Sequence, residues 1–134
     1  MNFTDLLPNP NDVLTGPHWQ GLKSGKILVP RCVACGYLRW PPASICPECL
    51  GSGTEWAEVA GAGTLWSFTV YHRALHPAFK EAIPYAVGIV ELDAGVQMIG
   101  RLGIPEDQLA VGMRLEAEFI TQTPELSLIE WVAS

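Results

Sequence analysis

The C-terminal half of the chain alternates hydrophobic and polar positions with a period of two, which is the pattern of strands that bury one face. The clearest example is residues 63–72, which are rich in β-branched and aromatic side chains. Strict alternation there would place Trp66, Phe68 and Val70 on one face. Four further segments share the pattern and are expected to be strands: residues 85–92, 96–102, 114–119 and 126–132.

The connections between these segments are short and carry turn signals. Asp93-Ala94-Gly95 joins the second and third segments and predicts a hairpin. Residues 105–109 predict a single helical turn with acidic residues at its N-terminal end. Five strands within about seventy residues indicate a small closed barrel, for which the five-stranded OB-fold is the leading candidate. A β-sandwich would give a similar periodicity.

The first 25 residues have a different pattern. Residues 1–14 show no period and contain prolines and asparagines, so they are expected to form an extended arm. A short helix is predicted to begin at Thr15 and to end at Gly25. In that helix Trp19 and Leu22, three residues apart, would share one face.

All four cysteines occur in two Cys-x-x-Cys pairs, Cys32 with Cys35 and Cys46 with Cys49. Two such pairs at close range predict one tetrahedral four-thiolate metal site, closed to substrate and therefore structural. Zinc is the expected ion, and iron in a rubredoxin-like shell would use the same ligands. Disulfides would need an oxidising compartment, but no secretory signal is visible at the N-terminus, so a cytoplasmic location is expected. A redox pair would explain one of the two motifs but not both.

The residues around the cysteines complete the expected ribbon. Residues 27–29 and 37–40 flank the first pair as short strands, and Pro41-Pro42 ends the second of them. Gly36 and Gly51 follow the two pairs, where tight turns need backbone freedom. The chain is thus predicted to be mainly β and to have three parts: an arm with a short helix (1–25), a rubredoxin-like zinc ribbon (26–54) and an OB-fold barrel (55–134).

The charge distribution restricts the function. The 134 residues carry a formal net charge of −6. Residues 51–134 hold eleven acidic residues against four basic ones, whereas residues 21–50 hold four basic residues and one acid. Binding of single-stranded nucleic acid is common for ribbons and OB-folds, but it requires a basic groove, so it remains only the alternative function. No apolar run approaches the roughly 20 residues of a membrane span, so no membrane association is expected.

The combination of these motifs resembles the zinc-ribbon OB-fold family known as domain of unknown function 35. The resemblance extends from about residue 15 to the C-terminus and rests on these motifs: His18-Trp19-Gln20-Gly21-Leu22, Arg31-Cys32-Val33-Ala34-Cys35-Gly36, Pro41-Pro42, Cys46-Pro47-Glu48-Cys49, Gly63-Thr64-Leu65-Trp66-Ser67-Phe68-Thr69-Val70, His76-Pro77-Ala78-Phe79, Pro84-Tyr85-Ala86-Val87 and Val90-Glu91-Leu92-Asp93. Each motif is weak alone, and the combination is specific.

The resemblance implies an accessory role. Members of this family are partners of thiolase-superfamily enzymes, among them thiolases, hydroxymethylglutaryl-CoA synthases and lipid-transfer-type aldolases, whose own subunits carry the catalytic residues. The expected function is therefore that of a noncatalytic subunit in a hetero-oligomer acting on acyl-CoA thioesters. A heterotetramer with two copies of each chain would follow if the partner is a dimer. The chain itself agrees, since every cysteine is assigned to metal and no Gly-x-Ser-x-Gly nucleophile motif is present.

Two sets of residues are candidates for contacts beyond the metal. If an acyl-CoA binds, its phosphates need cations and its adenine needs an aromatic surface, and the candidates are Tyr71, His72, Arg73, Lys80 and Arg101. Ordinary solvated charges on a barrel edge are the alternative explanation for each of them. A partner interface is expected at Trp19, Leu22 and Trp40, together with the apolar residues of the arm, Phe3, Leu6 and Leu7, because aromatic side chains commonly anchor interfaces. Packing of the helix on the ribbon would be the alternative for Trp19.

Overall fold

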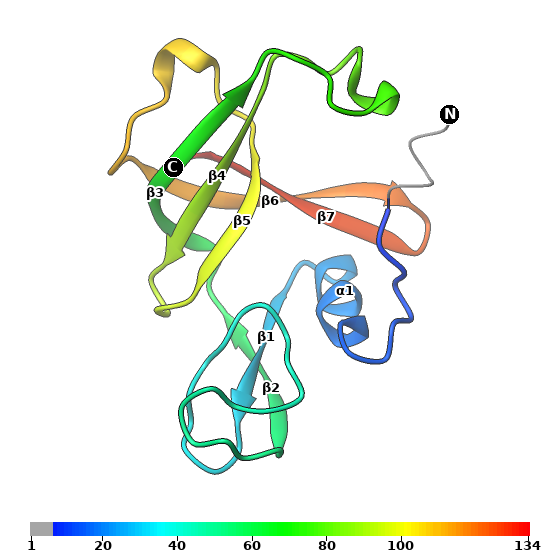
Figure 1. The fold of residues 1–134 in the computed structure, drawn as a ribbon, viewed down its shortest axis with the longest axis vertical. Coiled ribbons are helices and arrows are strands. Elements are labelled where there is room, and N and C mark those ends of the chain that lie inside the picture. Colours follow the sequence, from blue (N-terminus) through cyan, green and yellow to red (C-terminus); the bar gives the residue numbers. More distant parts are fainter. Residues whose placement is uncertain (1–6) are drawn as a thin grey trace.

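In the computed structural model, which describes residues 7–134, a closed barrel and a small two-stranded sheet both pack against one helix (Figure 1). Helix α1 (Gly16–Lys23) is followed by the small sheet, β1 (Ile27–Cys32) and β2 (Thr54–Val59). The barrel strands are β3 (Ala62–Tyr71), β4 (Tyr85–Leu92), β5 (Gln97–Leu102), β6 (Arg114–Thr123) and β7 (Leu126–Ala133). Two 3-10 turns, η2 (Pro77–Phe79) and η3 (Glu106–Gln108), lie in the connections.

The barrel closes in the order β3-β4-β5-β7-β6, with β3 also pairing with β6. All neighbours are antiparallel except β5 and β7, which pair in parallel over only two positions, Arg101 with Glu130 and Leu102 with Trp131. This parallel seam is the shortest in the barrel, since the β3–β6 pairing covers three positions. The predicted five-stranded barrel, its hairpin at Asp93-Ala94-Gly95 and the helical turn at 105–109 are confirmed.

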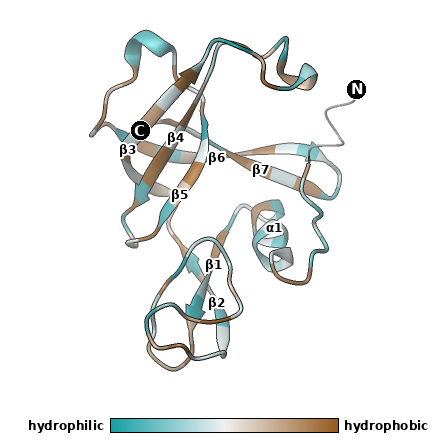
Figure 2. Ribbon diagram, in the orientation of Figure 1, coloured by the Kyte–Doolittle hydropathy of each residue, from teal (hydrophilic) through white to brown (hydrophobic). Residues whose placement is uncertain are grey.

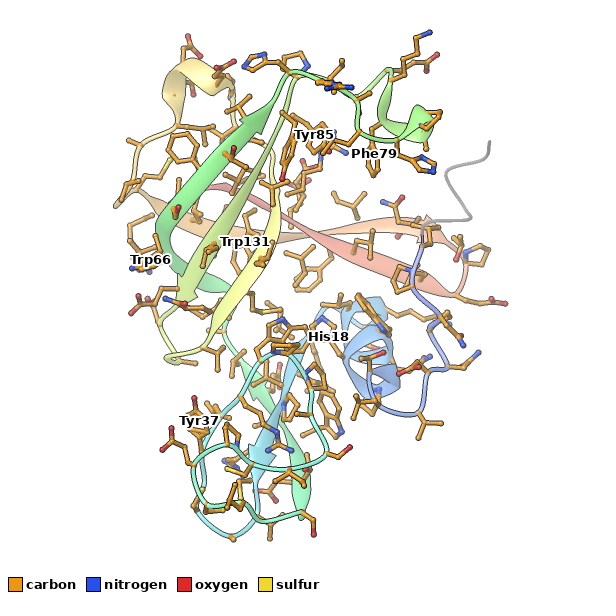
Figure 3. The ribbon with its side chains drawn as sticks, viewed as in Figure 1. His18, Tyr37, Trp66, Phe79, Tyr85 and Trp131 are labelled. Atoms are coloured by element: carbon orange, nitrogen blue, oxygen red, sulfur yellow. The ribbon has the colours of Figure 1, made fainter. Side chains whose placement is uncertain are left out.

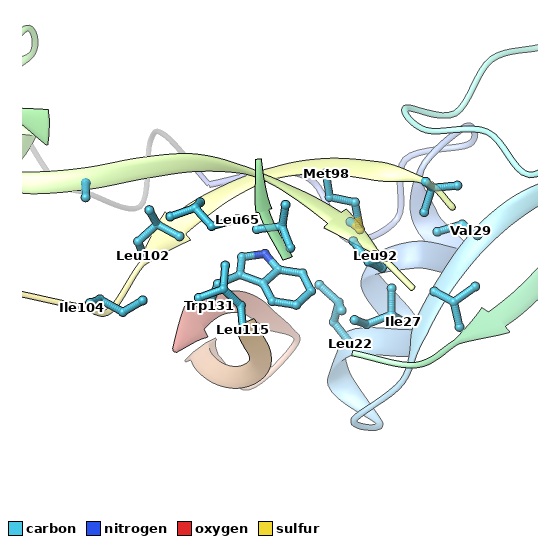
Figure 4. Close-up of a cluster of buried hydrophobic side chains, with 14 residues drawn as sticks. Leu22, Ile27, Val29, Leu65, Leu92, Met98, Leu102, Ile104, Leu115 and Trp131 are labelled. Carbon is cyan, nitrogen blue, oxygen red and sulfur yellow. The ribbon is translucent and has the colours of Figure 1, made fainter. Parts of the chain in front are cut away.

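Trp131 fills the barrel interior. It is 1% exposed and lies among Leu65, Leu102 and Leu115 in the close-up (Figure 4). The neighbouring strand β5 has no side chain at Gly100, where a Cβ would lie 2.6 Å from Cδ1 of Trp131. Along the barrel strands, brown hydrophobic segments alternate with pale or teal ones (Figure 2). This is the pattern of strands that bury one face.

The hydrophobic core does not stop at the barrel. Leu22 of α1 and Ile27 and Val29 of β1 belong to the same buried cluster (Figure 4). Helix α1 lies between the ribbon and β7 (Figure 1), and its residues contact β1, β6 and β7. The arrangement predicts that ribbon and barrel fold as one cooperative unit, since burial of a shared apolar surface couples them.

Local sequence explains where α1 begins and ends. The Asp12 carboxylate accepts bonds from the backbone N–H groups of Leu14 and Thr15, which holds the chain in a turn before the helix. Pro17 occupies the first turn, where a missing N–H is harmless. Gly25, with a φ of 76°, follows the C-terminus in the left-handed conformation. The predicted helix is confirmed.

The prediction of a strand at residues 37–40 is wrong. β1 pairs with β2 instead, and the 37–40 segment contributes a single bridge, between Arg31 and Leu38. The Arg39 N–H donates to the carbonyl of Pro30 at 3.0 Å, but Pro30 has no N–H with which to return the second bond of the pair. The ladder on that edge of β1 therefore stops after one bridge. The two-stranded sheet of the ribbon is formed by β1 and β2 alone, and β2 ends at Val59.

The prediction that Trp66 shares a strand face with Phe68 and Val70 is also wrong. A register shift between Leu65 and Ser67, typical of a β-bulge, breaks the alternation of β3 at Trp66. Leu65 is buried and Phe68 packs against the core, whereas Trp66 is 55% exposed. An alternation argument assumes a continuous pleat, so it cannot locate such a bulge.

Candidate metal centre and barrel rim

The four cysteine sulfurs form one cluster. Their Sγ atoms all lie within 4.8 Å of one another. Cys32 and Cys49 are 3.4 Å apart, and Cys35 and Cys46 are 3.7 Å apart. A tetrahedron with Zn–S bonds of about 2.3 Å has edges of about 3.8 Å, so these separations fit a tetrathiolate ion. They exceed the roughly 2.05 Å of a disulfide bond, and all four cysteines are free.

Two similar turns present the sulfurs. The Gly36 N–H donates to the Cys32 carbonyl at 2.8 Å, and the Leu50 N–H donates to the Cys46 carbonyl at 2.9 Å. Gly36 has the expected left-handed backbone, with φ 79°. In the second turn this conformation falls on Leu50, with φ 63°, and not on Gly51 as expected. Gly51 instead leaves room for the metal cluster, because a Cβ at this position would lie only 3.3 Å from the Cys49 sulfur.

The electrostatics of the cluster favour a cation. A bond from the Cys35 backbone N–H is the main cause that lowers the pKa of Cys32 to about 6. The Tyr37 N–H acts in the same direction on Cys35, but desolvation and the neighbouring sulfurs outweigh it and raise the pKa of Cys35 to about 12. Four thiols this close cannot all ionise together unless a positive ion compensates them. A divalent ion would be held by all four sulfurs, with no coordination position left for substrate.

A second group of side chains gathers at the barrel rim. The rings of Tyr71 and Tyr85 stack at 5.1 Å, and Phe79 stacks on Tyr85 at 5.5 Å. The Arg101 guanidinium lies 5.6 Å from the centre of the Tyr85 ring. Figure 3 shows Tyr85 and Phe79 facing each other beside the 72–84 connection. Two residues predicted to contact CoA, Tyr71 and Arg101, thus both contact Tyr85. Tyr85 and Phe79 were not among the residues predicted for this site.

The other predicted rim residues are more dispersed. His72 is exposed and lies 3.3 Å from a carboxylate oxygen of Glu106, and Arg73 and Lys80 are exposed. His76 accepts a bond from the Ala78 N–H and caps η2. The register that pairs Tyr71 with Tyr85 depends on the long 72–84 connection. No short turn signal specifies that pairing, which is why Tyr85 could not be found in advance.

Beside this rim lies a groove of about 370 Å³. It runs over the short β5–β7 seam, and its lining is mostly apolar with Arg101 and Glu130 as the charged members: Leu7, Pro8, Phe79, Tyr85, Val87, Arg101, Ile120, Gln122, Leu128, Ile129 and Glu130. An apolar cleft with a few charged groups is typical of a ligand site. Leu7 of the arm lines it, whereas Phe3 and Leu6 lie outside the described residues.

The residues expected at a partner interface differ in accessibility. Leu22 is 2% exposed and packs inside this chain, so it offers no surface to a partner. Trp19 and Trp40 are half-buried, each with its ring in contact with the His18 ring, and the indole of Trp19 donates to the Thr15 hydroxyl. For these two the interface stays a prediction.

An outward apolar stripe was not foreseen. Ile89 stands opposite Ile99 in the β4–β5 ladder and beside Ser67 of the bulged strand. Trp66 and Ile99 are 55% and 72% exposed. The bulge is what adds Trp66 to this face, and a sequence pattern does not reveal it.

Comparison with known proteins identifies both parts. Residues 19–55 match the family model for the rubredoxin-like zinc ribbon domain of ChsH2, and residues 56–119 match that for the ChsH2 C-terminal OB-fold domain. The four-cysteine cluster is thus a structural zinc site. No helix within residues 7–134 has the length and apolar composition that crossing a bilayer requires.

Several relatives are known by sequence. The chain is 35% identical over 125 residues to a probable enoyl-CoA hydratase alpha subunit from Thermomonospora curvata, covering 92% of this chain and 39% of the relative. It is 32% identical to the 3-oxo-4,17-pregnadiene-20-carboxyl-CoA hydratase alpha subunit of Mycobacterium tuberculosis, covering 84% of this chain and 35% of the relative. The chain therefore spans somewhat over a third of the length of these two relatives.

Solved structures are similar over more of their length. A chain of the structure described as the Ltp2-ChsH2(DUF35) aldolase is 31% identical with a TM-score of 0.83, over 94% of this chain and 98% of that chain. A DUF35-family protein of unknown function from Sulfolobus solfataricus shares the fold, with 20% identity and a TM-score of 0.60 over 88% of this chain and 83% of that one.

A further relative matches over most of its length. The DUF35 domain-containing scaffold protein of Methanocaldococcus jannaschii is 35% identical over 106 residues, which cover 75% of this chain and 73% of the relative. Together with the two family models, this match shows that the chain belongs to the DUF35 family of zinc-ribbon OB-fold proteins.

Proposed function

We propose that this chain is the noncatalytic, zinc-stabilised subunit of a hetero-oligomer in which a thiolase-superfamily partner, a thiolase or an aldolase, acts on acyl-CoA thioesters. The supporting observation is the likeness to the DUF35 chain of the Ltp2-ChsH2(DUF35) aldolase, which is matched over 98% of its length. A match along the whole of that chain favours an equivalent place in an assembly, which a match to one motif would not.

The chemistry of the described residues supports the division of labour. A catalyst of thioester cleavage needs an activated nucleophile, and all four cysteines belong to the zinc cluster. Their closed shell has no position for a substrate. The four free thiols also suit a reducing compartment, so the proposed location is the cytoplasm.

The barrel rim is the proposed point of contact with the CoA ester. Tyr71 lies in the aromatic stack and Arg101 beside it, and a planar base can stack on such rings. The remaining residues proposed to meet phosphate groups lie on the 72–84 connection: His72, Arg73 and Lys80. Arg101 already has a weak contact with Glu130, at 4.0 Å, so phosphate would compete with a partly exposed carboxylate.

The proposed partner surface comprises Trp19, Trp40 and the apolar stripe of Trp66, Ile89 and Ile99. Trp40, Ile89 and Ile99 also line one shallow hollow of about 310 Å³ between the ribbon and the barrel. Apolar side chains that surround a surface hollow are typical of the centre of an interface, where a partner buries them on binding.

The test is reconstitution of acyl-CoA cleavage. The chain alone, a thiolase-superfamily partner alone and the coexpressed pair are assayed with an acyl-CoA substrate, and turnover is expected to be highest in the pair and absent from the chain alone. Because two relatives are hydratase alpha subunits, a hydratase partner forms the second arm. Rate enhancement only with the hydratase partner would replace the thiolase-superfamily proposal.

A matched pair of variants tests the rim. Arg101→Met is expected to raise KM for the acyl-CoA about tenfold with little change in kcat, because a lost charged contact in the bound state costs about 1.5 kcal/mol or more. Arg31→Met is the control, since Arg31 is an exposed arginine that pairs with Glu55 on the ribbon. Equal KM values for both variants would contradict a role of Arg101 in CoA binding.

A further inference from the structure

Arg39 is a buried arginine in the ribbon. Its residue is 4% exposed, and one of its guanidinium nitrogens, Nη2, donates to the Ala43 carbonyl at 2.9 Å and to the Thr54 hydroxyl. The other two nitrogens, Nε and Nη1, are buried without any hydrogen-bond partner among residues 7–134.

Such a charge is costly unless it is compensated. An arginine does not lose its proton in proteins, so burial cannot neutralise it. The salt bridges within residues 7–134 involve other basic residues, namely Arg31, His72, Arg101 and Arg114. A buried charge without a partner is strongly destabilising, so an anion is expected nearby.

The segments that Arg39 joins are those that carry the cysteine pairs. Its backbone N–H donates to Pro30, two residues before Cys32. Thr54, which accepts from Nη2, stands opposite Cys32 in the β1–β2 ladder, and Ala43 lies three residues before Cys46. Arg39 is thus tied to both halves of the metal cluster.

Four thiolates around a divalent zinc ion leave a net charge of about −2, which makes the loaded centre an anion within the ribbon. We propose that Arg39 is a positioning residue of the zinc centre: its guanidinium clamps the segments bearing the two cysteine pairs and supplies the buried positive charge that offsets the zinc tetrathiolate. Its two unpaired nitrogens are then tolerated because the anionic cluster, and not a carboxylate, stabilises the charge.

The experiment measures zinc affinity by competition with a chelator in the full chain. Arg39→Met is expected to weaken the zinc Kd by about 10- to 100-fold, the usual effect of losing a residue that supports the metal ligands. Arg39→Lys keeps the charge and is expected to recover part of this loss. The control is Arg31→Met, which removes an exposed cation of the same ribbon and is expected to leave Kd unchanged.

Cobalt substitution adds a readout that a purely structural role would not move. In the Co²⁺ form of Arg39→Met, the tetrahedral d–d bands should remain while the sulfur-to-cobalt charge-transfer band shifts to lower energy, since the thiolates lose a nearby positive charge. A Kd and a charge-transfer band equal to those of the unsubstituted chain would overturn the proposal, as would an equal loss in Arg31→Met. If Arg39→Met does not fold, the test rests on Arg39→Lys, because lysine cannot reproduce the bonds of the guanidinium to both Ala43 and Thr54. An unchanged zinc Kd for Arg39→Lys would also overturn the proposal.

Discussion

The Nδ1 atom of His18 lies 2.9 Å from the carbonyl oxygen of Leu28, and this bond connects α1 to β1. Figure 3 shows where the His18 side chain lies. The imidazole is 2% exposed, and its ring centre lies 4.9 Å from that of Trp19 and 4.2 Å from that of Trp40. One histidine therefore links α1, β1 and the 37–41 segment of the ribbon. Because a carbonyl only accepts, Nδ1 carries the proton in the neutral ring.

His18 should make stability depend on pH. Burial lowers its pKa below 6.5 in the folded chain, and the bond to Leu28 offsets only part of that shift. The unfolded chain therefore binds the proton first as pH falls. The contribution of the neutral ring is complete above pH 6.5 and is lost as pH falls through the lower folded-state pKa.

The variant His18→Asn can keep a donor for Leu28 without titrating. We expect the free energy of unfolding in urea to fall less for His18→Asn than for the unsubstituted chain between about pH 7.5 and about pH 5.5. Comparing the two proteins at each pH cancels the protonation of the cysteines. Parallel pH profiles would show that His18 does not titrate in this window.

Gly100 and Trp131 set the packing inside the barrel. Gly100→Ala is expected to destabilise the chain by about 1–3 kcal/mol, because the new methyl group would overlap the indole and force a shift in the core. Gly16→Ala is the matched control. There a Cβ meets its nearest atom at 3.6 Å, and alanine favours the helix. The change in Tm relative to the unsubstituted chain should differ between the two variants in sign or at least in size. Equal changes in Tm would contradict the packing argument.

Features fixed by local chemistry were predictable from the sequence. The cysteine spacing, the turn at Gly36 and the strand alternation depend on a few neighbouring residues, and the metal cluster, the helix and the barrel followed from them. The resemblance to a known family then supplied the expected partner class, which residue patterns alone do not contain.

Features set by long-range pairing were not predictable. The 37–40 segment has strand-like composition, but Pro30 on the neighbouring strand stops the ladder. Trp66 changes face at a bulge, and Tyr85 reaches Tyr71 only after the chain returns from the 72–84 connection. The burial of Leu22 and Arg39 likewise depends on how the ribbon meets the rest of the chain.

Removing one metal ligand should unfold the ribbon. Cys46 is fully buried, and Cys46→Ser is expected to lose zinc and most of the ribbon's stability, since a structural zinc site supplies roughly 10 kcal/mol or more of folding free energy. Zinc content by mass spectrometry and thermal unfolding provide the measurements. Ser44→Ala, an exposed change in the same loop, serves as the control. A Cys46→Ser protein with full zinc content and unchanged unfolding would refute the assignment of this ligand.

Asp93 and Arg114 form a two-fold contact between the β4–β5 hairpin and β6, with both N···O distances at 2.8 Å. This contact lowers the pKa of Asp93 below its usual 3.8, so the stabilisation is present above that value and is lost as pH falls through the folded-state pKa. Arg114→Met should raise the pKa of the Asp93 carboxyl measured by carbon NMR. Arg101→Met should leave it unchanged, and an unshifted Asp93 in Arg114→Met would contradict the contact in solution.

The central claim is that this chain is completed by a thiolase-superfamily partner. The most direct measurement is copurification of the coexpressed pair through a tag on this chain, followed by determination of the mass of the complex in solution. We expect a stable hetero-oligomer that is weakened by Trp66→Ser together with Ile99→Ser, two outward changes that spare the core. A chain that purifies without the partner, or that instead binds single-stranded oligonucleotide tightly at physiological salt, would contradict the account.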